Sequence, residues 1–74
     1  MGKYEVIVPI PDQETVDNGV VVLEENQTIE QWVKARALQG LAMHGVVQES
    51  TLVQEILPDK INDIVISRFT AEVL

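Results

Sequence analysis

The chain of 74 residues carries 12 Asp and Glu against five Lys and Arg, a formal net charge of −7. This charge argues against electrostatic binding to nucleic acid or to an anionic membrane surface, because both are negatively charged. The chain has no cysteine and one histidine, which excludes disulfides, thiolate metal sites and a multi-histidine cluster within one chain. Hydrophobic residues make up 46% of the chain, too many for disorder, and no apolar run approaches a membrane span. The apolar stretch after Lys3 is short and interrupted by proline, unlike a signal peptide. We therefore expect one small, acidic, cytoplasmic domain over residues 1–74, without a cofactor.

The composition favours β-structure, since Val and Ile together account for more than a quarter of the chain. Residues 3–9 alternate, with Tyr4, Val6 and Val8 on one side, and this period of two predicts a strand that the following prolines end. The pair Asn18-Gly19 is a strong signal for a tight hairpin turn. It predicts a strand over residues 20–24 and a weak strand, or only a loop edge, over residues 14–17.

A helix is predicted over residues 29–44. Thr28 has the residue type of an N-cap, and Gln31 follows it at the spacing of a capping box. Apolar residues then recur at helical spacing, and Gly45 suits the position just after a helix. Gly40 weakens the helix interior by roughly 1 kcal/mol against alanine, so the helix could also end there.

Two segments complete the chain. Residues 50–57 are interpreted as a shorter helix that Pro58 terminates. Residues 61–74 alternate with Val65, Ser67, Phe69, Ala71 and Val73 on one face, which favours a strand, although a helical reading exists as well. The resulting order β-β-α-α-β predicts an α+β fold, in which a three-stranded antiparallel sheet carries two helices on one face. We expect the last strand to lie beside the first.

Few residues suggest catalysis or metal binding. His44 has no serine or cysteine partner at a suggestive spacing and is interpreted as a helix-end or surface residue. The carboxylates of Asp12, Glu14 and Asp17 do not follow the pattern of a calcium loop and are interpreted as a solvated acidic loop. The chain is therefore predicted not to be an enzyme. An active site that pools residues from several chains is the remaining enzymatic alternative.

The charge is distributed unevenly. Residues 1–30 hold seven acidic residues and one basic residue, a net charge of −6, whereas residues 31–74 carry −1. Such an acidic region can steer a basic partner toward the protein, although solubility alone also explains it.

The predicted helix over residues 29–44 is apolar nearly all round, so either the second helix or another chain should cover its far side. We therefore expect a homodimer or higher oligomer. Trp32 is the best candidate for an anchor in an interface, although plain packing against the sheet is the favoured interpretation of this residue. Arg36 lies within the apolar arc, where it would snorkel to solvent or pair with an acidic residue of a partner.

The sequence thus predicts a non-enzymatic protein-interaction module. It would be a small acidic adaptor, inhibitor or regulator, typical of bacterial and phage accessory proteins, and would bind a basic protein partner. The alternative is a structural homo-oligomer whose assembly is its function. The candidate partner-binding residues are Glu14, Asp17, Glu24, Glu25, Trp32 and Arg36.

Overall fold

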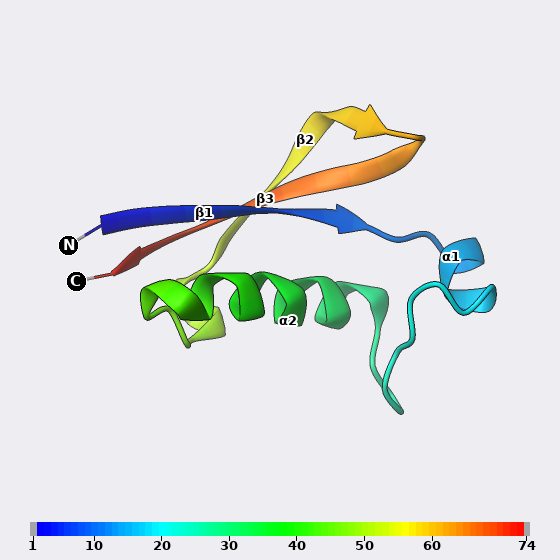
Figure 1. The fold of residues 1–74 in the computed structure, drawn as a ribbon, viewed down its shortest axis with the longest axis horizontal. Helices are drawn as coiled ribbons and strands as arrows, with labels where there is room; N and C mark the ends of the chain where they lie inside the picture. The colour runs from blue at the N-terminus through cyan, green and yellow to red at the C-terminus, as the bar shows by residue number, and fades with distance from the viewer. Residues whose placement is uncertain (1, 74) are drawn as a thin grey trace.

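The computed structural model describes residues 2–73 and has an α+β fold (Figure 1). Its elements in chain order are strand β1 (Gly2–Ile10), short helix α1 (Gln13–Asp17), long helix α2 (Ile29–Leu41), the 3-10 turns η1 (Ala42–His44) and η2 (Glu49–Thr51), and strands β2 (Val53–Ile61) and β3 (Ile64–Val73). The three strands form one antiparallel sheet with β3 in the centre, in the order β1-β3-β2. The predicted fold class is confirmed, and its element order holds in outline.

The pairing of the first strand with the last is also confirmed. The register of β1 and β3 runs from Gly2 opposite Val73 to Ile10 opposite Val65. The predicted alternation holds in both strands, because Val6 lies opposite Phe69 and Val8 opposite Ser67 on the face toward α2. The ends of the described chain consequently lie side by side at one end of the sheet (Figure 1).

Helix α2 begins where the sequence predicts. The backbone N–H of Gln31 donates to Thr28 Oγ1 at 3.1 Å, and the backbone N–H of Thr28 donates to Gln31 Oε1 at 3.0 Å, which completes the capping box. The helix passes through Gly40, continues into η1, and ends at Gly45 in the left-handed conformation with φ 88°. The alternative end at Gly40 is therefore wrong.

The predicted hairpin at Asn18-Gly19 is wrong. Residues 14–17 belong to α1, whose N-cap Asp12 accepts hydrogen bonds from Thr15 N at 2.8 Å and from Thr15 Oγ1 at 2.6 Å. Residues 20–24 form a loop and pair with no strand of residues 2–73. Asn and Gly tolerate a positive φ, which is common at a helix end as well as in a hairpin turn. Here Gly19 adopts a φ of 76° just after α1.

The predicted helix over residues 50–57 is also wrong. After η2, this segment enters β2, which pairs with β3. Pro58 does not end a helix here, because it lies in an edge strand where the register with β3 shifts between Ile56 and Lys60. The true hairpin turn is Asn62-Asp63, whose φ angles of 51° and 64° are those of a type I′ turn.

The core lies between the sheet and α2. Val33, Ala37 and Leu41 of α2 are buried against side chains of β1 and β3, and Phe69 is fully buried at the centre of this layer. The opposite face of the sheet carries no helix among residues 2–73, as Figure 1 shows. A two-layer domain with one open sheet face is the result.

Candidate functional site

A groove runs along the side of α2 that faces away from the sheet. The groove is shallow and open to solvent, with a volume of about 590 Å³ between α2, the loop before it and the segment after η1. We call it the α2 groove; its lining residues are Val22, Glu24, Gln27, Trp32, Ala35, Arg36, Leu38, Gln39, Ala42, Val46 and Val47. The apolar residues that make α2 hydrophobic nearly all round therefore form part of the groove wall. The second helix expected to cover them is absent, since residues 53–61 form β2.

Trp32 links the groove to the core. Its side chain is half-buried and packs against the cluster that contains Val33, Ala37 and Phe69, and it also lines the groove. The core-packing interpretation therefore holds for part of this side chain, and its role as an anchor in an interface stays a prediction. The indole has a fixed apolar support on one side and an open groove on the other.

Glu24 is positioned by a tight turn before α2. Its backbone N–H donates to Gln27 Oε1 at 3.0 Å, and its carbonyl accepts from the Gln27 N–H at 2.9 Å. Asn26 adopts a positive φ of 63° within this turn, which Asn tolerates better than most residues. The turn fixes the backbone from which the Glu24 carboxylate lines the groove.

Arg36 lines the groove with its positively charged guanidinium group. Its Nη1 donates to Gln39 Oε1 at 3.0 Å, one helical turn further along α2. The side chain is exposed and does not lie in the apolar core. The groove lining therefore contains one carboxylate and one guanidinium among mostly apolar side chains.

The structure brings together three of the six predicted partner-binding residues. Glu24, Trp32 and Arg36 line the α2 groove, whereas Glu14 and Asp17 lie on α1 and Glu25 lies one position further along the turn, outside the lining. Asp17 accepts a hydrogen bond from Gln13 Nε2 at 2.9 Å within α1. These three carboxylates can add to the electrostatic field near the groove without forming its walls.

Sequence reasoning missed two exposed valines of the groove. Val22 is 78% exposed and Val47 is 72% exposed, and both line the groove. The sequence predicts a strand over residues 20–24, whereas Val22 lies in a loop, between the half-buried Val21 and Leu23.

The carboxyl of Asp12 has a lowered pKa. Hydrogen bonds from the Thr15 hydroxyl and then from the Thr15 backbone N–H lower the pKa of its carboxyl below 3.8. This carboxylate caps α1, so its role among the described residues is to hold the helix start. The predicted solvated acidic loop is thus a short capped helix.

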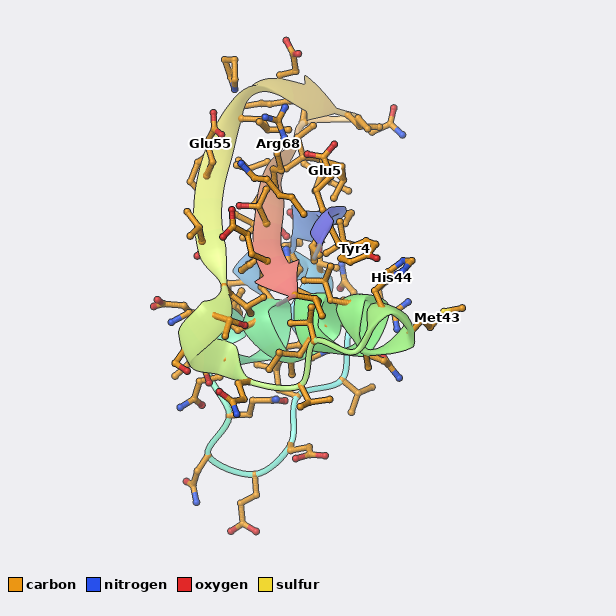
Figure 2. The ribbon with its side chains drawn as sticks, turned by 90° about the vertical axis from the view of Figure 1, so that its left-hand side faces the viewer. Tyr4, Glu5, Met43, His44, Glu55 and Arg68 are labelled. Atoms are coloured by element: carbon orange, nitrogen blue, oxygen red, sulfur yellow. The ribbon has the colours of Figure 1, made fainter. Side chains whose placement is uncertain are left out.

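Two further side-chain clusters include residues of the sheet. The ring of His44 stacks on the ring of Tyr4 with centroids 4.3 Å apart and an angle of 11° between planes. On the open sheet face, Arg68 of β3 lies 3.6 Å from Glu5 of β1 and 3.6 Å from Glu55 of β2 (Figure 2). Within residues 2–73, no group of three His, Asp or Glu residues could hold a metal ion.

None of the helices formed by the described part of the chain is long and apolar enough to cross a membrane. The chain matches no family model, no curated protein and no solved structure.

Proposed function

We propose that this chain is a non-enzymatic protein-interaction module, an acidic adaptor, inhibitor or regulator that acts in the cytoplasm. Its partner is a basic protein segment that binds in the α2 groove. The observation that carries this proposal is the presence of Trp32 and Glu24 in one groove that is bordered by exposed valines. Trp is enriched among residues that dominate binding energy in protein interfaces, and an apolar wall beside a carboxylate suits a segment with both apolar and basic side chains.

The residues that line the groove suggest which contacts the partner segment would make. An apolar side chain of the partner contacts Trp32 and the small residues Ala35 and Ala42 of α2. A Lys or Arg of the partner pairs with Glu24, whose backbone the turn holds in place. The surrounding charge of residues 1–30 attracts the basic segment before contact and raises its association rate.

A fluorescence titration tests the proposal. Trp32 is the only tryptophan of the chain, so its emission reports directly on the groove. The probes are synthetic peptides of about 12 residues that combine Lys or Arg with one apolar anchor, and matched peptides in which Asp and Glu replace the basic residues. We expect the basic peptides to change the Trp32 emission and to bind more weakly as salt is added, because salt screens the attraction. Equal binding of basic and acidic peptides, or no change with either, would contradict the proposal.

Two single variants separate local contact from overall charge. Glu24→Gln and Glu25→Gln remove the same charge from adjacent positions, but only Glu24 lines the groove. Both should slow association to a similar extent, since the long-range field loses one charge in each. Only Glu24→Gln should also speed dissociation. Equal dissociation rates for the two variants would argue against a direct contact with Glu24.

A further inference from the structure

The outer edge of β1 is an unpaired strand edge. Among the described residues β1 pairs with β3 alone, over nine consecutive residues without a register shift. β2 forms the other edge of the sheet, but there Pro58 and the shift between Ile56 and Lys60 interrupt the strand. Prolines and bulges are common protection against pairing of sheet edges; they interrupt β2 in its middle, whereas residues 2–8 of β1 contain neither.

The direction of the β1 backbone groups follows from the contact of Ser67. This buried hydroxyl donates to the carbonyl of Val8 at 2.9 Å, so the Val8 carbonyl points toward β3. In an antiparallel strand the N–H and C=O of one residue point to the same side, and successive residues alternate. The N–H and C=O groups of Lys3, Glu5 and Ile7 therefore point to the free edge. Pro9, which has no N–H to offer, falls on the same side.

We infer that a second copy of this chain pairs with β1 along this edge, antiparallel and related by a two-fold axis at Tyr4. This register places Lys3 of one copy opposite Glu5 of the other, twice across the axis. These are residues whose backbone groups point to the free edge, so both backbone hydrogen bonds and opposite charges match. A two-fold axis at Glu5 would place two carboxylates opposite each other, and an axis at Val6 would pair neither charge.

The side chains beside the free edge of β1 are also compatible with a second copy of the chain. Tyr4 and His44, which stack on each other, and Met43, which is 89% exposed, lie on the β1 side of the molecule (Figure 2). A second copy at β1 would add its own aromatic and methionine side chains beside these. The product is one six-stranded sheet with the two β1 strands at its centre and both α2 helices on one face. This inference uses no residue of the α2 groove and stands independently of the proposed function.

Sedimentation equilibrium and light scattering of the intact chain test the inference. We expect a species of twice the 8.3 kDa chain mass at micromolar concentration. Glu5→Lys should raise the dimer dissociation constant by about tenfold or more, because like charges then face each other at two positions. Lys3→Glu should have a similar effect. The double variant Lys3→Glu/Glu5→Lys restores opposite charges in the inferred register and should recover the wild-type dissociation constant within about threefold.

Glu55→Lys is a matched control. Glu5 and Glu55 both lie 3.6 Å from Arg68 and their side chains are equally exposed at 63%, but they stand on opposite edges of the sheet. Both lysine variants therefore lose an equivalent ion pair with Arg68, and only Glu5→Lys alters the inferred interface. Circular dichroism and thermal unfolding verify that each variant is folded. A monomer at all concentrations, equal effects of Glu5→Lys and Glu55→Lys, or a double variant that stays monomeric would each overturn the inference.

Discussion

Gly40 lets α2 approach β1 closely, and replacing it tests this packing. An alanine within an exposed helix normally stabilises it by about 1 kcal/mol relative to glycine. Here, a methyl group at position 40 would lie 3.1 Å from Cγ2 of Val6, whereas carbon atoms in contact normally lie about 3.5–4.0 Å apart. We therefore expect Gly40→Ala to lower the free energy of unfolding, against the helix propensity.

The surroundings of Val6 determine how much Gly40→Ala changes the free energy of unfolding. Its β-branched side chain has little rotameric freedom, and it packs against both clusters of the core, so it cannot turn away cheaply. Overpacking of this kind typically costs about 1–3 kcal/mol. After subtraction of the gain in helix propensity, Gly40→Ala should destabilise the protein by about 1 kcal/mol. In a Val6→Ala background the same substitution should instead stabilise it by about 1 kcal/mol, which gives a coupling energy of about 2 kcal/mol.

Urea unfolding followed by circular dichroism measures all four members of this cycle. Ala35, which is exposed on α2, supplies the calibration, because Ala35→Gly reports the helix propensity of the same helix without a contact to the sheet. If Gly40→Ala alone stabilised the protein by as much as Ala35→Gly destabilises it, the close approach to Val6 would have no energetic weight and the reasoning would fail.

Two further predictions concern the core and the first helix. Phe69→Ala removes a fully buried side chain and should lower the free energy of unfolding by about 3–5 kcal/mol. This is a large share of the roughly 4–11 kcal/mol expected for a domain of this length, so the urea midpoint should fall to a much lower concentration. A midpoint near that of the wild type would contradict the central position of Phe69. The pKa of Asp12 is lowered in the folded chain, so its contribution to stability is present above the unfolded value and is lost as pH falls through the folded value. NMR titration should place the pH midpoint of the Asp12 carboxyl below 3.8. Thr15→Val removes the hydroxyl donor, which has the largest effect, and should move this midpoint back toward 3.8. An unchanged midpoint in the variant would show that the Thr15 hydroxyl does not lower the pKa.

The elements that could be predicted from the sequence carry their own local signals. The capping box at Thr28 and Gln31 and the left-handed Gly45 define both ends of the α2 region without help from the rest of the chain. The alternation in β1 and β3 similarly reflects one buried face and one open face. The central pairing of these strands follows from the same pattern.

The hairpin of β2 and β3 could not be placed from local signals. Asn18-Gly19 and Asn62-Asp63 both suit a turn with positive φ, and only the second has strands on both sides to join. Pro58 ends helices and central strands alike, and its tolerance in β2 depends on a register shift that arises only after pairing with β3. Tertiary pairing, which one segment alone does not encode, decided both cases.

The candidate site was predictable in its chemistry and not in its geometry. The apolar character of α2 nearly all round points to Trp32 and Arg36, and the acidic charge of residues 1–30 points to Glu24. That these three residues share a groove depends on the path of the loop before α2, where the hairpin signal at Asn18-Gly19 predicts a strand over residues 20–24. The acidic charge of residues 1–30 does not indicate whether Glu24 or Glu25 lines the groove, because this depends on the turn that positions the Glu24 backbone.

The pairing of β1 with β3 also has a consequence for the order in which the chain folds. The hairpin of β2 and β3 closes over a two-residue turn, whereas β1 meets β3 only after a loop of more than 50 residues has closed, since Gly2 pairs with Val73 and Ile10 with Val65. Contacts of such high sequence separation slow folding, because loop entropy is lost before the contacts form. We expect the docking of β1 to limit the folding rate, after the hairpin and α2 have begun to form. Until then, β3 is itself an edge strand, and its apolar face is exposed to any other strand in the solution.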